Sequence, residues 1–382
     1  MLLEKHTRRM MNPNIWNPTY TITPTIAQRL MAIEAAKAMV EHTPLPPTIE
    51  AELRRRARIR STHYSTRIEG NRLTLEETEQ AIAGAHTFQG RERDVVEVRH
   101  YWDALARVES WAVQGRPLTE ALIKRLHALV MCGPRARPTP YRDGQNVIRD
   151  VASGAIVYLP PEAKDVPGLM KALVQWGRQA EQAGAPAPVI AGLFHYQFVT
   201  IHPYFDGNGR TARLLATFLL HRSGYGLNGY FSLEEHHARD LESYYRALVT
   251  HPHHNYYEGR AQADLTPWLA YFIDTLARVF TLAQEEALNL AEHPLPSEPE
   301  IVRGLDRRAR IILGMFHQSE QITTKDAARS LGLSERMTRN LMQDWVKSGF
   351  LEVAEPSRRK RAYRLSAIYR QYIGSLSAID GD

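Results

Sequence analysis

The segment 202–213, HPYFDGNGRTAR, holds the side chains of a phosphate-ester site. His202 can accept a proton near neutral pH. Asp206 supplies a carboxylate of the kind that holds Mg²⁺ together with substrate phosphates. Arg210 and Arg213 are three residues apart, so on a helix they share one face and both reach an anion held at the helix start. This combination predicts chemistry on a phosphate group.

The flanking sequence indicates how these side chains are positioned. Two strongly apolar stretches, 188–200 and 208–223, are predicted as buried helices on either side of the segment. Gly207, Asn208 and Gly209 then lie at the start of the second helix, where unpaired backbone N–H groups and the helix dipole favour an anion. Glycines allow a phosphate to approach the backbone closely. Each feature alone is common in ordinary turns and helices, and the prediction depends on their coincidence.

The surrounding chain is predicted to be mainly α-helical, with one β-hairpin. Segments 146–150 and 155–159 form the hairpin, with a turn at 152–154 and Pro160-Pro161 as its stop. Thr74 and Glu77 form a capping box at the start of one helix. The further predicted helices cover 48–62, 75–84, 94–114, 119–131, 167–182, 233–250 and 265–291.

The last part of the chain has a different pattern, after a proline-rich linker at 294–299. Helices are predicted at 309–318, 324–331 and 334–348, followed by strands at 350–353 and 362–365 around a basic turn, 357–361. This order is typical of a winged helix-turn-helix domain. It suggests DNA binding through Arg336, Arg339 and Asn340, or alternatively a protein-interaction module.

Composition narrows the class of protein. The chain has 382 residues, a formal net charge of +6 and a single cysteine, Cys132, so it forms no intramolecular disulfide. Residues 300–373 contain roughly 15 Lys and Arg against about 8 Asp and Glu, which is about the whole net charge. The charged N-terminus does not resemble a signal peptide, and no stretch has the length of a membrane span. We therefore expect a cytoplasmic protein with no membrane association.

The segment 202–213 closely resembles the signature of Fic proteins, His-Pro-Phe-x-Asp/Glu-Gly-Asn-Gly-Arg-x-x-Arg. Tyr204 replaces the usual Phe, which adds a hydroxyl that needs a partner. The hairpin is similar to the family's flap, which docks the target segment. The expected docking residues are Val147, Ile148, Val157 and Tyr158. The stretch 241–248 is similar to a helix that borders the nucleotide base, which implicates Tyr245 and Leu248.

The resemblance implies protein AMP transfer, with ATP as co-substrate. His202 would be the general base for a Ser, Thr or Tyr hydroxyl, and Asp206 would hold Mg²⁺, or alternatively Mn²⁺. Gly207, Asn208 and Gly209 would form the anion cradle, and Arg210 and Arg213 would hold the β- and γ-phosphates. The chemistry would depend on positioning and charge neutralisation.

A second motif lies far upstream, at Ser65, Glu69 and Gly70. It resembles the Ser/Thr-x-x-x-Glu-Gly/Asn inhibitory motif of one Fic class, whose glutamate pairs with the second signature arginine, here Arg213. An arginine neutralised in this way cannot also neutralise a phosphate. The resemblance therefore implies autoinhibition by Glu69.

The expected organisation is an N-terminal helical region at 1–117 with the inhibitory motif at 65–70, a Fic core at 118–292 and a winged helix at 300–376. Removal of AMP from modified protein, use of another nucleotide or of phosphocholine, and a DNA-binding regulator remain alternatives. The target protein, self-modification and a homodimer are left open by the sequence.

Overall fold

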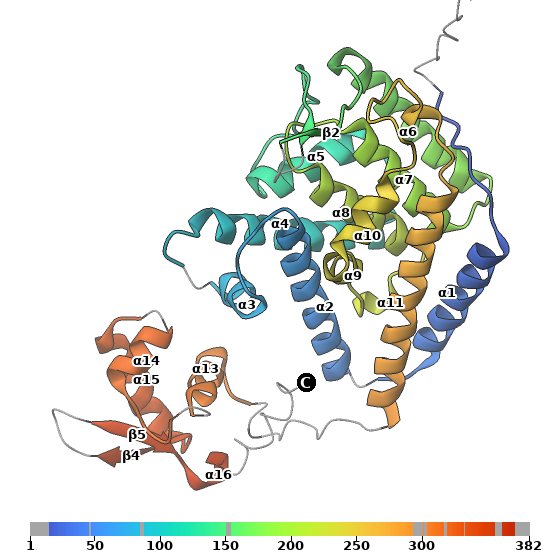
Figure 1. Ribbon diagram of the computed structural model, residues 1–382. Helices are drawn as coiled ribbons and strands as arrows, with labels where there is room; N and C mark the ends of the chain where they lie inside the picture. The colour runs from blue at the N-terminus through green and yellow to red at the C-terminus, as the bar shows by residue number, and fades with distance from the viewer. Residues whose placement is uncertain are drawn as a thin grey trace, which may run out of the picture. The chain divides into compact units, whose positions relative to one another are not determined.

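The computed structural model describes residues 15–45, 47–84, 88–149, 154–292, 301, 304–316, 319–331, 333–355 and 361–370. They form two compact units, residues 1–292 and 293–382 (Figure 1). The predicted linker at 294–299, the hairpin turn at 152–153 and most of the basic turn at 357–361 lie outside the described residues. The described part of the chain is mainly helical, as predicted.

The N-terminal unit is a helical assembly with one small hairpin. Its β-strands, β1 (Ile148–Arg149) and β2 (Ile156–Tyr158), pair antiparallel, which confirms the predicted hairpin. Its helices are α1 (Pro24–His42), α2 (Pro47–Ile68), α3 (Leu75–Ala83), α4 (Glu92–Val113), α5 (Glu120–Cys132), α6 (Val166–Gln182), α7 (Ala187–Ile201), α8 (Asn208–Arg222), α9 (Leu233–Arg239), α10 (Leu241–Leu248) and α11 (Thr266–Glu292), with short 3-10 turns at Ala163–Asp165, Leu227–Gly229 and Arg260–Gln262.

Helices α7 and α8 form the centre of this unit. Nearly every residue of both helices is buried, in agreement with their apolar sequences. Helix α8 packs against α7, α4 and α5. The loop between α7 and α8 carries residues 202–207 and α8 itself carries 208–213, so the segment is held by several helices.

Two helical predictions for the N-terminal unit need correction. The single helix predicted at 233–250 is two helices, because Asp240 leaves the helical conformation and caps α10 by accepting a hydrogen bond from Ser243 N. Helix α1 was not predicted. It buries Ile26, Ile33 and Val40 beside α11 (Figure 1), but exposed methionines on its outer face obscure the helical pattern.

The C-terminal unit has a separate apolar core around Ile312, Met342, Trp345 and Tyr363. Its three strands pair antiparallel in the order β3–β5–β4. The sequence did not predict β3, which has only two residues. The elements are α13 (Arg307–Met315), β3 (Ile322–Thr323), α14 (Thr324–Leu331), α15 (Glu335–Lys347), β4 (Leu351–Glu355), β5 (Ala362–Leu365) and α16 (Ala367–Arg370).

Candidate active site

The loop between α7 and α8 is held in one conformation by its own side chains. His202 ends α7 in the left-handed conformation, with φ 51°, and Gly207 precedes α8 with φ 76°. The Asn208 amide accepts from Tyr204 N at 3.0 Å and donates to Tyr204 O at 2.8 Å. Asn208 therefore clamps the loop through its side chain, a function that the sequence did not reveal.

His202 is presented as a neutral imidazole. Its Nδ1 lies 3.2 Å from Val199 O, and because a carbonyl only accepts, Nδ1 carries the proton and Nε2 keeps its lone pair. Burial lowers the pKa of His202 to about 4. Arg142, at the base of the hairpin, braces the same turn by donating from Nε to His202 O at 2.9 Å. The ring can therefore accept a proton at neutral pH.

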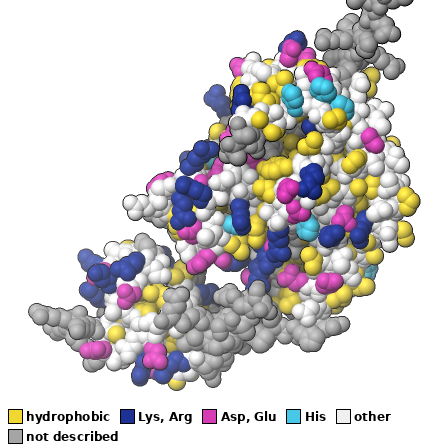
Figure 2. Space-filling view, in the orientation of Figure 1, with side chains coloured by type: hydrophobic (Ala, Val, Ile, Leu, Met, Phe, Trp, Pro, Cys, Tyr) yellow, Lys and Arg dark blue, Asp and Glu magenta, His cyan; other side chains and the backbone are white. Residues whose placement is uncertain are grey.

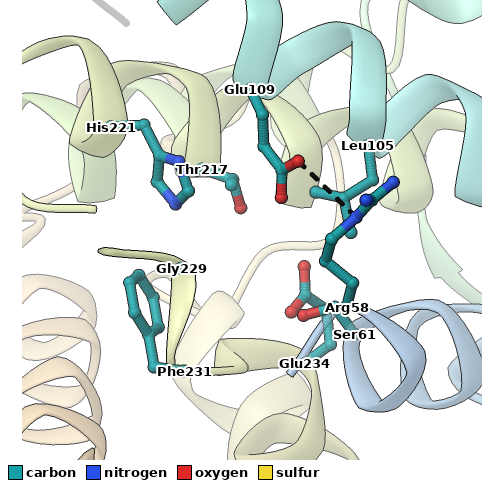
Figure 3. Close-up of a pocket in the computed structure, with 9 residues that line it drawn as sticks. All are labelled: Arg58, Ser61, Leu105, Glu109, Thr217, His221, Gly229, Phe231 and Glu234. Carbon is teal, nitrogen blue, oxygen red and sulfur yellow. Dashed lines mark ion pairs between the residues drawn. The ribbon is translucent and has the colours of Figure 1, made fainter. Parts of the chain in front are cut away.

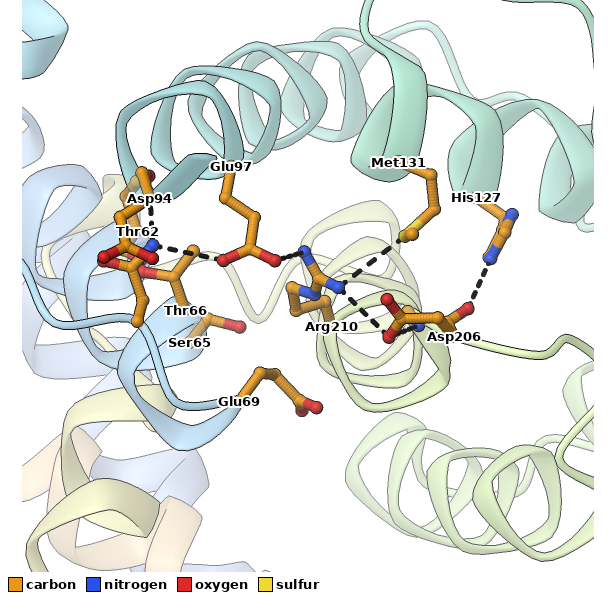
Figure 4. Close-up of polar contacts among 12 residues, drawn as sticks. Thr62, Ser65, Thr66, Glu69, Asp94, Glu97, His127, Met131, Asp206 and Arg210 are labelled. Carbon is orange, nitrogen blue, oxygen red and sulfur yellow. Dashed lines mark hydrogen bonds and ion pairs between the residues drawn. The ribbon is translucent and has the colours of Figure 1, made fainter. Parts of the chain in front are cut away.

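Two glycines at the start of α8 are closely approached by side chains from other elements. A Cβ on Gly207 would meet Met131 Sδ at 2.5 Å, and a Cβ on Gly209 would overlap Glu69 Oε1. The Glu69 side chain points from the end of α2 toward the start of α8 (Figure 4). A carboxylate thus lies where the sequence predicts a phosphate.

Arg213 is buried, and its Nε and Nη2 groups are hydrogen-bonded. It donates from Nε to Ser65 Oγ, from Nη2 to Ser65 O and from Nη2 to Glu69 Oε1, each at 2.8 Å. Gly70 follows with φ 92°, a conformation suited to glycine, as α2 ends. The residues of the upstream motif and the second signature arginine are therefore in contact.

Arg210 has a different set of partners, on α4 and in the loop before α8. Its guanidinium, 2% exposed, donates from Nη1 to Glu97 Oε1 at 2.8 Å, and Nη2 lies 3.4 Å from Asp206 Oδ1 (Figure 4). Asn71 donates to the other oxygen of Glu97 at 3.1 Å. Arg210 is thus already paired with a carboxylate, and it also orients Asp206.

Asp206 itself faces solvent, with 53% of its side chain exposed. Its Oδ1 accepts from Gly207 N at 2.6 Å. No cluster of three or more His, Cys, Asp or Glu side chains that could hold a metal occurs in the described ranges. Asp206 therefore offers one carboxylate, which is what Mg²⁺ shared with a polyphosphate requires.

Tyr204 packs inward, as its position in the signature implies. Its ring stacks on His127 at a centroid distance of 3.6 Å. His127 Nε2 lies 2.8 Å from Asp206 O, and burial lowers the pKa of His127 to about 4. In the described part of the chain the Tyr204 hydroxyl has no hydrogen-bond partner, so the expected partner is not found.

The hairpin residues divide between surface and core. Val147 and Val157 are exposed and Ile148 is half-buried. Tyr158 is buried and donates to Thr200 O at 2.6 Å, so its side chain anchors the hairpin and is not exposed on its surface.

The two predicted base contacts lie on α10. Tyr245 is exposed and Leu248 half-buried. Burial raises the pKa of Tyr245, and the charge of Glu69 raises it further, which places this ring within electrostatic reach of the Glu69–Arg213 pair.

Part of the chain that contains this site matches a known protein family. Residues 117–220 match the family model described as Fic/DOC family. The match includes the whole segment 202–213.

Particular relatives point to an enzyme class. A protein adenylyltransferase Fic from Drosophila willistoni is 30% identical over 200 residues, covering 52% of this chain and 39% of the relative. One from Drosophila grimshawi is 33% identical over 165 residues, covering 43% of this chain and 33% of the relative. Their name denotes a nucleotidyltransferase. The chain thus matches less than half the length of these relatives.

Solved structures show the same fold. A Fic family protein from Desulfovibrio desulfuricans aligns with a TM-score of 0.58 and 27% identity, over 92% of this chain and 99% of that one. A Fic-domain signalling protein from Bacteroides thetaiotaomicron aligns with a TM-score of 0.58 and 26% identity, over 69% of this chain and 97% of that one. None of the described helices is both long and apolar enough to cross a membrane.

Proposed function

We propose that this protein transfers AMP from ATP to a hydroxyl of a target protein. The observation that carries the proposal is the Glu69 carboxylate held on Arg213 at the start of α8, because this contact marks an anion position beside a neutral histidine. The relatives named protein adenylyltransferase support the same reaction.

In this reaction Nε2 of His202 takes the proton of a Ser, Thr or Tyr hydroxyl. The hydroxyl oxygen forms a bond to the α-phosphorus, the bond from that phosphorus to the α–β bridging oxygen breaks, and pyrophosphate leaves. Backbone N–H groups of Gly207, Asn208 and Gly209 receive the phosphates, and Arg213 binds the γ-phosphate once it is free. Arg210, whose charge is paired with Glu97, acts in this proposal by orienting Asp206.

Asp206 is the residue that would hold Mg²⁺, or alternatively Mn²⁺. Its carboxylate is exposed, and its Oδ1 accepts from Gly207 N and lies near Arg210 Nη2. When bound, the metal neutralises charge on the phosphates.

The Glu69 contact is proposed to be autoinhibitory. Glu69 takes one N–H of the Arg213 Nη2 group and pairs with its charge, so that N–H and that charge are not available to a phosphate. ATP would then bind without its γ-phosphate in place. Dimerisation and self-modification would be ways of setting or releasing this state.

Labelled ATP tests the reaction type. Glu69→Gly protein is incubated with Mg²⁺ and ATP labelled at either the α- or the γ-phosphate. We expect label in protein from α-labelled ATP only. Label from γ-labelled ATP would indicate phosphate transfer and contradict the proposal. If neither transfers label, the reverse reaction is tested with AMP-modified protein, because a glutamate beside Arg213 could equally position a water. Other nucleotides and phosphocholine are tested as donors in the same assay.

A second candidate function, DNA binding, belongs to the C-terminal unit, residues 300–376. Helix α15 buries Thr338, Met342 and Trp345 and exposes Arg336, Arg339 and Asn340. Figure 2 shows Lys and Arg side chains gathered on the surface of this unit. A basic exposed helix face beside a three-stranded sheet is the arrangement of a winged helix that contacts phosphates. A salt-dependent shift of duplex DNA by the full chain tests it.

A further inference from the structure

We infer that Tyr101 and Glu234 are positioning residues for Arg213, through a hydrogen-bond chain that fixes Ser65. The inference rests on the proposed function, because it concerns how Arg213 is aimed at the γ-phosphate. It separates the partners of Arg213 into a permanent anchor, Ser65, and a removable cap, Glu69.

The chain has a fixed direction. An arginine only donates, so Ser65 Oγ accepts from Arg213 Nε and keeps its own hydrogen to donate. A carboxylate only accepts, so the Tyr101 hydroxyl donates to Glu234 Oε1, at 3.1 Å, and its oxygen is free to accept from Ser65. The pKa of Tyr101 reflects both neighbours, because burial and the charge of Glu234 raise it while Arg213 and the hydrogen bond from Ser65 lower it.

These three residues come from three helices and are all buried. Ser65 lies on α2, Tyr101 on α4 and Glu234 on α9, and each is at most 2% exposed. Ser232 donates to the second oxygen of Glu234 at 3.2 Å. Burying a carboxylate costs free energy, and hydrogen bonds offset that cost. The bond from Tyr101 also sets the direction of the chain to Arg213.

Glu234 also borders the cavity drawn in Figure 3. Glu234 lines it together with Ser61 and Arg58 of α2 and Thr217 of α8. Its volume is about 10 Å³, which is room for roughly one water molecule, so it holds no nucleotide. Thr217 donates from Oγ1 to Arg213 O at 3.1 Å, which fixes the backbone of Arg213 from the same side. The chain therefore ends at Glu234, beside a cavity that is too small for a nucleotide.

The anchor and the cap use different hydrogens of the guanidinium. Ser65 occupies Nε and one N–H of Nη2, while Glu69 occupies the other N–H of Nη2. When Glu69 is removed, the anchor still holds the guanidinium plane, and the freed N–H points at the cradle. A phosphate then meets an arginine that is already oriented.

The test is nucleotide binding in the Glu69→Gly background, with and without Tyr101→Phe. Because the mutation removes one link of the anchor, we expect ATP affinity to fall between about 3- and 10-fold. AMP lacks the γ-phosphate, so its affinity should stay the same. KM for ATP should rise more than kcat falls. Tyr225→Phe is the matched control, since its hydroxyl also donates to a glutamate, Glu34, and takes no part in the hydrogen bonds from Arg213 to Glu234.

The possible outcomes distinguish the role of Glu69 from the role of Tyr101. If Glu69→Gly binds ATP no more tightly than the wild type, the proposed autoinhibitory contact is wrong, whatever Tyr101→Phe does; AMP transfer itself fails only if label from α-labelled ATP does not enter protein. If Glu69→Gly binds more tightly and Tyr101→Phe leaves the ATP-to-AMP affinity ratio unchanged, or lowers both affinities equally, the positioning role is wrong. Should Tyr101→Phe not fold, Glu234→Gln carries the same test, with a smaller expected fall because an amide oxygen still accepts.

Discussion

The two signature arginines of the N-terminal unit and the charged side chains of the C-terminal unit differ in burial. In the N-terminal unit Arg210 and Arg213 are 2% and 3% exposed and each contacts a carboxylate. Among the described residues of the C-terminal unit, charged side chains stay at the surface, as in the Arg364–Glu352 pair, where both side chains are more than one third exposed. Burying a charge is costly unless it is paired, so buried arginines mark positions with a specific requirement. Surface arginines carry no such cost and suit a diffuse phosphate surface.

The largest effect is expected at the base. His202→Ala in the Glu69→Gly background should lower AMP transfer about 10²- to 10⁴-fold, because no other group is placed to take the hydroxyl proton. ATP affinity should stay within about twofold, since the side chain does not belong to the phosphate cradle. Initial rates of label incorporation and calorimetric binding measure the two quantities. A comparable loss of both would indicate a structural role for His202.

Ion pairs in the two units should differ in their contribution to stability. Glu97→Gln leaves the buried Arg210 charge without its principal partner and should lower the free energy of unfolding by roughly 3 kcal/mol. Glu352→Gln removes the partner of Arg364 and Arg370 at the surface and should cost about 1 kcal/mol or less. Calorimetry of the two full-length variants makes the comparison, and equal costs would contradict it.

Acid should destabilise the N-terminal unit selectively. Burial lowers the pKa of His63, His127 and His221 to about 4 and that of His195 to about 3. Because the unfolded chain protonates these rings near pH 6.5, their contribution is complete above that pH and is lost as the pH falls toward 4. We expect the melting temperature to fall between pH 7 and pH 5.

His221→Gln tests the origin of this dependence. It removes one titrating ring whose pKa is lowered by burial alone, so the fall in melting temperature with pH should become shallower. An unchanged slope would exclude this ring as a contributor.

The smallest effects are expected on the surface of α15. Arg336→Ala and Arg339→Ala should each weaken DNA binding and reduce the salt dependence of affinity by about one charge, without changing AMP transfer. Gel-shift titrations at several salt concentrations measure this, with Arg310→Ala on α13 as the control. Equal effects of all three would indicate general charge attraction.

The sequence predicted what depends on local pattern. The helices around the segment 202–213, the hairpin and the capping box at Thr74 each follow from neighbouring residues. Glu97, Tyr101 and Glu234 were not found, because each looks like an ordinary helix residue and acquires its partner only when distant helices pack. The break at Asp240 was missed because a capping aspartate also fits a helix surface.

The most direct test of the central claim is incorporation of label from α-labelled ATP into protein by the wild type, Glu69→Gly, and Glu69→Gly with His202→Ala. The account predicts weak labelling by the wild type, an increase on the order of 100-fold in Glu69→Gly, and loss of that increase in the double variant. Equal labelling by the wild type and Glu69→Gly, with ATP binding intact in both, would contradict it.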